Sequence, residues 1–418
     1  MYRLPSRFLS FWLLLIPLII IIALFLPAHL RARQESAVAE FTPPMSPAEA
    51  QQSVIAAQQA EQSQRNALLS STQSASQTYT AMGLPRVQTV YVNETGYHVS
   101  DRTGFLDFWR RHGGVLVFGY PISEEIVEDG QIVQYFERAR LEYHPEIEDP
   151  DFQVQLTLLG RELTTEQTFP AVETGSGDLF FPETGYGISD PFLHFWLKRG
   201  GLRLFGYPIS GPIEEISPVD GQPRIVQYFE RARFEHHPDD MAPFYRQQAQ
   251  AFNLRLMSLY EIRLTDLGRQ AAVQRGHAFA RSQRLAEVPE WSPILWERRI
   301  DVNLTTQQLT AYEGNIPVFR APITTGKDGF NTPVGSFAIY SQLPMQTMQG
   351  TAGGESWYVP NIPWVQYIVG GVAFHGTYWH DLWGTGIRRS HGCINLNIDD
   401  AHWLYEWADI GTTVNIFY

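Results

Sequence analysis

The chain repeats a long segment of its own sequence, and this repeat constrains the fold more than any other feature. The segment from Glu94, ETGYHVSDRTGFLDFWRRHGGVLVFGYPISEE, returns from Glu183 as ETGYGISDPFLHFWLKRGGLRLFGYPISGP. A second pair follows in the same order, IVQYFERARLEYHPE from Ile132 and IVQYFERARFEHHPD from Ile225. A tandem match of this length indicates two copies of one module, which we place at residues 87–165 and 178–272.

Each copy carries the pattern of a small α+β unit. Three aromatic residues recur at i, i+3 and i+4, which predicts one face of a short helix, and a glycine pair follows where that helix should end. The FGYPIS segment is typical of a turn and IVQYFERAR of a strand. Such rings either form a core or stack on sugars, and the pattern leaves both interpretations open. They are Phe105, Phe108 and Trp109 in the first copy and Phe192, Phe195 and Trp196 in the second.

The two modules loosely resemble repeats found on bacterial surface proteins, including those of the LGFP type. The resemblance rests on the repeated segments quoted above and is too loose to carry a ligand across, so wall glycan binding by the modules is a hypothesis. The formal net charge of −13 argues against nucleic acid as a partner and against broad electrostatic adhesion to anionic wall polymers. Any anionic substrate must therefore be bound by arginine side chains close to the site.

The first residues indicate export. Arg3 and Arg7 precede an uncharged run from Phe8 to Leu26, which is long enough to cross a bilayer as a helix with the N-terminus in the cytoplasm. An A-x-A pattern ending at Ala39 leaves a cleaved signal peptide as the alternative. We therefore expect residues 1–33 to be a membrane anchor or a signal segment. The remainder should be extracytoplasmic, either membrane-anchored or secreted to the cell wall.

Two further stretches link these parts. Residues 34–86 are rich in Ala, Gln and Ser, and a helix over 46–70 would have little apolar surface to bury, so we expect a spacer. Residues 273–293 are helix-prone and form a connector.

From residue 294 onward the sequence becomes β-rich. RIDVNLTTQQLTAYEGNIPVFRAPITTG alternates apolar and polar residues and breaks at Glu313-Gly314-Asn315, as a hairpin does. A short helix from Asp399 to Ala408 and a closing strand complete a mainly-β domain at residues 294–418. The expected fold is therefore multidomain: an N-terminal transmembrane or signal helix, two small α+β modules and this C-terminal mainly-β domain.

This last domain holds the only cysteine of the chain, Cys393, in RRSHGCINL. A single cysteine in an exported chain cannot form an internal disulfide, so it is a buried thiol, an intermolecular link or a nucleophile. A nucleophilic thiol needs a base or a positive environment, and a glycine beside it lets backbone N–H groups gather as an oxyanion hole. The nearby candidates are His375, His391, Arg388, Arg389 and Gly392.

The spacing around Cys393 resembles the signature of the L,D-transpeptidase catalytic domain family, in which a histidine precedes an S/T-H-G-C-apolar-N motif. Here His375 lies fifteen positions before Ser390, which opens the segment SHGCIN. The resemblance extends over Ile294 to Tyr418 through IDVNLTTQQLTAYEG, TPVGSF, FHGT and GTTVNI. It implies an acyltransferase that acts on peptidoglycan stem peptides and needs no cofactor.

The resemblance also implies roles by position. Cys393 would be the nucleophile, His375 the general base oriented by the carbonyl of Gly376, and His391 a second histidine that shapes the pocket. Ser390, Gly392 and Asn395 occupy the supporting positions of the loop. A further group of residues either binds substrate or only packs and solvates the loop: Arg388, Arg389, Tyr378, Trp379 and His380.

By this resemblance, Cys393 releases a terminal D-alanine from a tetrapeptide stem and holds the remainder as a thioester. An amine of a neighbouring stem then attacks, giving a cross-link between two third-position residues. If water attacks instead, the same site is an L,D-carboxypeptidase. A zinc site is disfavoured because the H-x4-H-x10-H-x-C spacing from His375 to Cys393 matches no usual ligand pattern.

Rival classes fit less well. A sortase usually carries its cysteine in a TLxTC context with an arginine downstream, and no arginine follows Cys393. Papain-like peptidases place cysteine before histidine, which is the opposite order. A catalytically inert wall-binding protein, with the repeats as its function, remains the alternative from another class.

Overall fold

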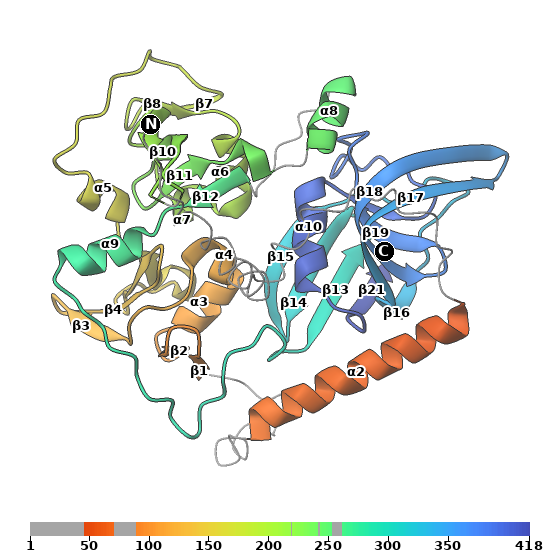
Figure 1. Cartoon of the computed structure of the whole chain (residues 1–418), viewed down its shortest axis with the longest axis horizontal. Coiled ribbons are helices and arrows are strands. Elements are labelled where there is room, and N and C mark those ends of the chain that lie inside the picture. The colour runs from red at the N-terminus through yellow and green to blue at the C-terminus, as the bar shows by residue number, and fades with distance from the viewer. Residues whose placement is uncertain (1–45, 71–88, 219, 241–242, 253–260) are drawn as a thin grey trace, which may run out of the picture. The chain divides into compact units, whose positions relative to one another are not determined.

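A computed structural model describes residues 46–70, 89–218, 220–240, 243–252 and 261–418 (Figure 1). The expected anchor or signal segment, residues 1–33, lies outside these ranges. Among the described residues, no helix is both long and apolar enough to cross a membrane. Residues 43–418 belong to one compact unit.

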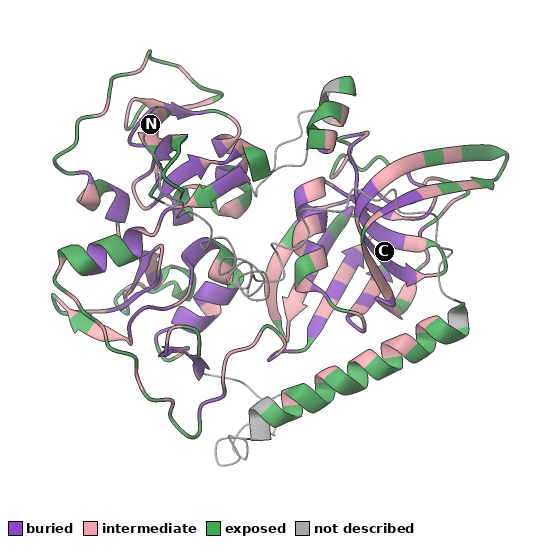
Figure 2. Ribbon diagram, in the orientation of Figure 1, coloured by how far each residue is buried: buried purple, intermediate pink, exposed green. Residues whose placement is uncertain are grey.

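The Ala/Gln/Ser-rich stretch contains one long helix, α2 (Pro47–Ser70). Ser46 and Glu49 start it with a capping box, because the Ser46 N–H donates to the Glu49 carboxylate at 3.0 Å and the Glu49 N–H to the Ser46 hydroxyl at 3.3 Å. Figure 2 shows the helix exposed over most of its surface, with a stripe of partly buried residues.

This stripe contacts the C-terminal domain. The Gln58 side chain donates to the Gly411 carbonyl at 2.9 Å, and Arg65 Nε donates to the Ile294 carbonyl at 3.2 Å. Val54 packs against the cluster around Tyr340 and Tyr367. Part of the expected spacer is thus a helix held against the domain that follows the repeats.

Both repeated segments share one series of elements: a β-hairpin, two short helices, a four-stranded antiparallel sheet and a third helix. The second copy has one additional helix, α8, before the last strand of its sheet. The first copy contains β1 (Thr89–Val92), β2 (Tyr97–Ser100), α3 (Phe105–Arg111), α4 (Gly114–Phe118), β3 (Ile126–Glu128), β4 (Gln131–Tyr135), β5 (Arg140–Tyr143), a 3₁₀ turn (Pro150–Phe152), β6 (Val154–Leu156) and α5 (Leu159–Leu163). The second contains β7 (Leu179–Phe181), β8 (Tyr186–Ile188), α6 (Phe192–Arg199), α7 (Gly201–Leu204), β9 (Ile213–Ile216), β10 (Pro223–Tyr228), β11 (Arg233–His236), a 3₁₀ turn (Pro238–Asp240), α8 (Pro243–Ala251), β12 (Ile262–Leu264) and α9 (Leu267–Gln274).

Equivalent side chains make the same hydrogen bonds in the two copies. The indole N–H of Trp109 donates to the Gly119 carbonyl at 3.1 Å, and that of Trp196 donates to the Gly206 carbonyl at 3.1 Å. These bonds fix the helix that carries each tryptophan against the FGYP turn. The sequence repeat is therefore also a repeat of local structure.

The expected single strand IVQYFERAR is instead a hairpin in each copy. In the first, β4 ends at Tyr135 and β5 begins at Arg140, and the Phe136 N–H donates to the Ala139 carbonyl at 2.8 Å. This turn has no glycine or proline. It forms because its backbone is held from outside: the N–H groups of Glu137 and Arg138 donate to the carbonyls of Tyr120 and Phe118, at 3.0 and 2.9 Å.

The third helix of each copy docks on the other copy. A Cβ on Gly160 of α5 would lie 1.8 Å from the Phe229 carbonyl oxygen, and a Cβ on Gly268 of α9 would lie 2.0 Å from that of Phe136. Only glycine permits such a close backbone approach. The segments concerned, LTLLGRE and LTDLGRQ, repeat one another in the sequence. The modules are therefore interlocked rather than strung in series.

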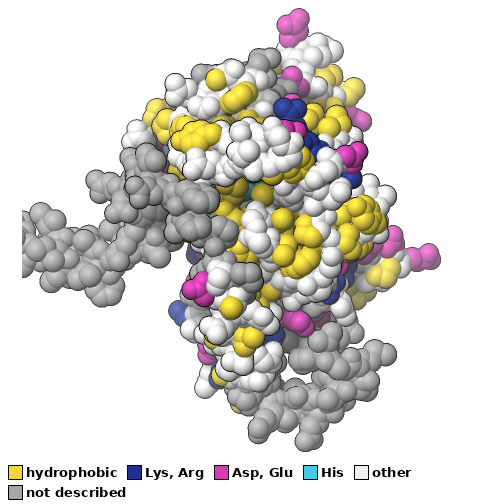
Figure 3. Space-filling view, turned by 90° about the vertical axis from the view of Figure 1, so that its right-hand side faces the viewer, with side chains coloured by type: hydrophobic (Ala, Val, Ile, Leu, Met, Phe, Trp, Pro, Cys, Tyr) yellow, Lys and Arg dark blue, Asp and Glu magenta, His cyan; other side chains and the backbone are white. Residues whose placement is uncertain are grey.

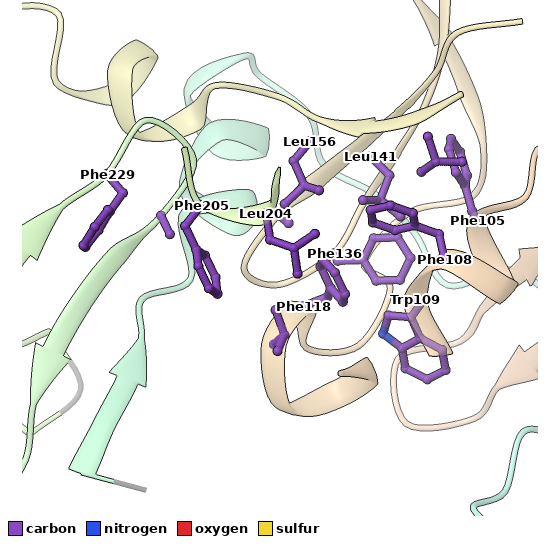
Figure 4. Close-up of a cluster of buried hydrophobic side chains, with 14 of the residues drawn as sticks. Phe105, Phe108, Trp109, Phe118, Phe136, Leu141, Leu156, Leu204, Phe205 and Phe229 are labelled. Atoms are coloured by element: carbon purple, nitrogen blue, oxygen red, sulfur yellow. The ribbon is translucent and has the colours of Figure 1, made fainter. Parts of the chain in front are cut away.

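The aromatic residues of the two copies form one core. Figure 4 shows side chains of the first copy, including Phe118 and Phe136, in the same cluster as Leu204 and Phe205 of the second. The six aromatic residues at helical spacing are all buried, between 0% and 6% exposed. They serve as core, so sugar stacking on these rings is not available to the modules.

The connector is helical only at its start, contrary to the helix-prone pattern. After α9 the chain forms turns and irregular segments up to residue 293, with no further helix. Contacts with the first module hold it: the Ser282 N–H donates to the Gly96 carbonyl at 2.8 Å, and the His277 ring stacks on Phe279 beside Tyr135. Tertiary contacts thus override the local helix propensity.

The C-terminal domain is mainly β, as expected. Its elements are β13 (Arg298–Asn303), β14 (Gln308–Glu313), β15 (Ile316–Pro322), β16 (Gly335–Ala338), β17 (Ser341–Ala352), β18 (Glu355–Val369), β19 (Val372–Gly376), β20 (Ile394–Leu396), α10 (Ile398–Trp407) and β21 (Thr413–Phe417). They form a five-stranded sheet, β15-β14-β13-β21-β16, and a four-stranded sheet, β17-β18-β19-β20. One hydrophobic cluster joins both sheets and α10, with Ile300, Phe374 and Leu404 fully buried.

A buried arginine links the first module to this domain. The Arg110 side chain is 5% exposed and pairs with Glu313 at 3.2 Å. Its guanidinium lies 3.5 Å from the centre of the Trp296 ring, and Glu313 also accepts from the Trp407 indole at 3.1 Å.

Candidate active site

Two neighbouring strands place Cys393 and His375 together. β19 and β20 run parallel, and their register pairs His375 with Asn395. Cys393 lies two positions before Asn395, so side-chain alternation puts its thiol on the same face of the sheet as the His375 imidazole. Along the strand direction, Cys393 lies two residues, or about 7 Å, before the position opposite His375.

His375 is held as a neutral base. Its ring Nδ1 lies 3.1 Å from the carbonyl of Gly376, so Nδ1 carries the proton and donates it there. Burial lowers the pKa of His375 to about 4, although the Gly376 carbonyl opposes the shift. The imidazole therefore stays neutral at physiological pH, with a lone pair on Nε2.

Cys393 is a half-buried free thiol in apolar surroundings. Sγ lies 3.6 Å from the Gly371 carbonyl, and the side chain packs against the cluster that contains Tyr367 and Ala373. Burial raises the pKa of the Cys393 thiol to about 11, although a hydrogen bond from the Ala373 backbone lowers it. The thiol is therefore protonated at rest, and the His375 imidazole is neutral as well.

The SHGC loop is shaped by the Ser390 hydroxyl. It donates to the Cys393 carbonyl at 2.6 Å and accepts the Gly392 N–H at 3.1 Å. Gly392 has φ of 120°, which favours glycine, and its carbonyl accepts from the Thr332 hydroxyl at 2.8 Å. The Gly392 N–H is thus already satisfied. Within the described residues, the N–H of Cys393 has no acceptor.

His391 faces the β17–β18 hairpin. Its Nε2 lies 3.0 Å from the Glu355 carboxylate, and its ring stacks on Trp357 with 4.2 Å between centroids. Lys327 pairs with the same carboxylate at 2.5 Å. The lysine, glutamate and tryptophan around His391 lie far from it in sequence, and no spacing in the sequence indicates them.

Asn395 and His380 form a buried pair. The amide nitrogen of Asn395 lies 3.0 Å from His380 Nε2, and His380 Nδ1 accepts the Leu382 N–H at 3.2 Å. Nδ1 is therefore the unprotonated nitrogen of a neutral ring, which requires a proton on Nε2. The Asn395 Oδ1 atom is left without a partner, so the amide fits better turned by 180°, with Oδ1 accepting from Nε2.

The remaining candidates separate into two groups. Arg388 is tied to its own loop, since Nε donates to the Gly326 carbonyl at 2.7 Å and the guanidinium also contacts Asn331. Tyr378 is 3% exposed and packs against Phe244 of α8. In contrast, Arg389 is exposed, and the Trp379 ring lies beside that of His375, 5.8 Å between centroids.

Exposed apolar side chains occur on this side of the domain beside charged ones such as Glu355 and Arg389. Tyr358 of β18 is 66% exposed and Ile387 is 52% exposed. Figure 3 shows hydrophobic side chains spread over the corresponding side of the molecule, with charged ones mostly at its edges. Among the residues placed by the structure, no three His, Cys, Asp or Glu side chains cluster as metal ligands.

Comparison with known proteins concerns the C-terminal domain. Residues 297–416 match the family model of the YkuD L,D-transpeptidase catalytic domain. Over 100 residues, 22% of this chain and 36% of the other, the sequence is 31% identical to probable L,D-transpeptidase 3 of Mycobacterium tuberculosis. The match thus spans about a third of that relative's length.

Solved structures of L,D-transpeptidases also align with part of this chain. The catalytic domain of an L,D-transpeptidase from E. faecium aligns with 29% of this chain and 97% of its own length, at 28% identity and a TM-score of 0.27. The crystal structure of L,D-transpeptidase 3 from Mycobacterium tuberculosis aligns with 29% of this chain and 62% of its own, at 19% identity and a TM-score of 0.27. The family match thus supports a YkuD L,D-transpeptidase catalytic domain at residues 297–416.

Proposed function

We propose that this chain is an extracytoplasmic L,D-transpeptidase that uses Cys393 as its nucleophile. The observations that support the proposal are the register of β19 and β20, which pairs His375 with Asn395 two positions after Cys393, and the hydrogen bond that holds His375 Nδ1 at the Gly376 carbonyl. That hydrogen bond leaves His375 Nε2 as the proton acceptor. The substrate class, peptidoglycan stem peptides, follows from the family of the domain.

The first half-reaction forms a thioester. Sγ attacks the carbonyl of the third stem residue while His375 takes the thiol proton, so that the thiolate is formed only as the S–C bond forms. The imidazolium then protonates the leaving amine of the terminal D-alanine as the peptide bond breaks. The Cys393 N–H supports the developing oxyanion, because the Gly392 N–H is already bonded to Ser390.

The second half-reaction regenerates the enzyme. The amine of a neighbouring stem attacks the thioester carbonyl, His375 accepts the proton of that amine, and the thiol leaves with a proton returned by the imidazolium. The product is a cross-link between two third-position residues. Attack by water at the same step would give L,D-carboxypeptidase activity.

Substrate contact is proposed for two residues of the loop. Arg389 is exposed, whereas the Arg388 guanidinium already contacts its loop, so Arg389 is the better partner for a stem carboxylate. Trp379 covers the His375 ring and limits water at the base. His391, Ser390 and Asn395 position the loop rather than react.

The proposal is tested by incubating the full chain with disaccharide-tetrapeptide muropeptides and analysing the products by mass spectrometry. Cross-linked dimers are expected with the wild type and absent with Cys393→Ala. His375→Gln, which retains a donor for the Gly376 carbonyl, should be slower by about 10²–10⁴-fold. Tripeptide without dimer would identify a carboxypeptidase. Neither product from a folded wild-type chain would contradict the proposal and favour a catalytically inert wall-binding protein.

A further inference from the structure

A pocket of about 380 Å³ lies where both repeat modules meet the C-terminal domain. Its volume falls in the range of sites that hold small ligands. It is separate from Cys393 and is lined by Arg111–Gly113, Lys198–Gly200, Pro317–Arg320 and Asp400.

The two modules contribute equivalent positions to this pocket. Arg111–Gly113 end α3 in the first copy, and Lys198–Gly200 end α6 in the second, where RRHGG and LKRGG occupy the same place in the repeat. The duplication therefore supplies cations to one cavity from two sides. A chain with only one module could not build this lining.

The charge of the lining opposes that of the chain. Four cationic side chains, Arg111, Lys198, Arg199 and Arg320, face one carboxylate, Asp400, in a protein of net charge −13. Asp400 is 1% exposed and is already used, since it contacts Lys198 at 3.3 Å and accepts from Asn397 at the start of α10. Arg111 in turn lies 3.8 Å from the Asp107 carboxylate. Counting Asp107, four cations stand against two carboxylates, so the net charge at the pocket is still positive.

Cations at helix ends have an ordinary explanation, because they offset the negative end of the helix dipole. Arg111 and Lys198 could serve that purpose alone. Arg320 cannot, since it lies in strand β15. The titration of His112 also reflects the positive charge nearby. Burial, together with Arg203 and Arg111, lowers the pKa of His112 to about 4.

The remaining wall of the pocket is apolar. Pro317, Val318 and Phe319 contribute from β15, and the Phe319 ring stacks on Trp403 with 4.0 Å between centroids. A cationic rim beside an apolar wall suits a ring-shaped ligand that carries an oxyanion. Guanidinium groups recognise carboxylate and phosphate alike.

We propose that this pocket binds an anionic saccharide, a sugar that carries a carboxylate or a phosphate. The carboxylate form would come from the peptidoglycan itself, and the phosphate form from an anionic wall polymer. Binding of the sugar does not require catalytic activity. The conclusion that this binding attaches the protein to the cell wall rests on the proposed function.

The test is a calorimetric titration of the full chain with three sugars: N-acetylmuramic acid, N-acetylglucosamine 1-phosphate and neutral N-acetylglucosamine. At least one of the first two should bind, the third should not, and added salt should weaken binding. Whichever anionic sugar binds identifies the source. No binding up to about 10 mM, or equal binding of the neutral sugar, would overturn the proposal.

Matched variants locate the site. Arg111→Gln with Arg320→Gln should weaken binding at least about tenfold. Arg102→Gln with Arg269→Gln removes the same charge from side chains that are 81% and 52% exposed outside the pocket, and should leave affinity unchanged. Unchanged affinity in the first variant would overturn the assignment. Cys393→Ala should bind the anionic sugar with unchanged affinity. The variant with Arg111→Gln and Arg320→Gln should still cross-link soluble muropeptides. Failure of the binding proposal and failure of the transpeptidase proposal therefore give different results.

Discussion

The neutral state of the Cys393–His375 pair can be measured through the reactivity of the thiol. The perturbation is pH, and the reagent is iodoacetamide, which alkylates thiolates. Burial raises the pKa of Cys393 to about 11. At pH 7.5 such a thiol is about 0.03% ionised, against about 9% for an ordinary cysteine of pKa 8.5, a ratio of about 300.

The assay is intact-mass spectrometry at a series of pH values. Because Cys393 is the only cysteine, every alkylated molecule reports this site. The rate should rise about tenfold per pH unit from pH 6 to 9.5 without a plateau, since the raised pKa postpones ionisation to higher pH. Glutathione under the same conditions controls for the reagent, and circular dichroism controls for folding.

A plateau below about pH 9 would refute this reasoning. It would mean that the thiol ionises early, as it does in a thiolate–imidazolium pair. His375→Gln separates the two cases: it should leave the pH dependence of a neutral pair unchanged, whereas it would shift the plateau of an ion pair to higher pH.

Three further predictions concern the structure that positions the site. Gly160→Ala and Gly268→Ala should each destabilise the modules by about 1–3 kcal/mol, because the new methyl group meets a carbonyl oxygen at 1.8 or 2.0 Å. Gly371→Ala is the control and should cost less, because nothing lies within 4 Å of the added Cβ and φ is not positive there, as at Gly160 and Gly268. An unchanged melting temperature for both Gly160→Ala and Gly268→Ala would contradict the interlocked arrangement. Arg110→Met should lower the free energy of unfolding by about 3 kcal/mol, because it leaves the mostly buried Glu313 carboxylate without its ion-pair partner. Adding Glu313→Gln to the same chain should recover part of this loss in a thermal unfolding experiment. If stability is not recovered, the ion pair does not stabilise this contact. Ser390→Ala should lower the free energy of unfolding by about 1–2 kcal/mol and slow acylation, because the Gly392 N–H loses its acceptor. Ser390→Thr keeps the hydroxyl and should restore both. Equal stability and acylation rates in the two variants would show that the hydroxyl does not position the loop.

Features that depend on local pattern could be predicted from the sequence. Alternation gave the hairpin at Gly314, where β14 ends at Glu313 and β15 begins at Ile316, and the helix expected from Asp399 to Ala408 is α10 within one residue at each end. The Gly376 carbonyl partner of His375 was implied by family resemblance, and the hydrogen bond is present.

Features that depend on distant contacts could not be predicted in this way. The FERAR turn has no turn residues of its own and is held by the FGYP segment. His391 is oriented by Glu355 and Trp357, which approach it only because β17 and β18 pair into a long hairpin. The exchange of α5 and α9 did leave a signal, the repeated LTLLGRE and LTDLGRQ, but sequence similarity does not tell which copy each helix contacts.

The central claim, that Cys393 forms a covalent acyl intermediate, is tested most directly by trapping that intermediate. The full chain is mixed with a carbapenem or a tetrapeptide muropeptide, quenched in acid, and the adduct is located by peptide mass spectrometry. The account predicts one acyl group per chain, on the peptide that contains Cys393, and none in Cys393→Ala. A folded wild-type chain that forms product without an adduct at Cys393, or that carries the adduct on another residue, would contradict it.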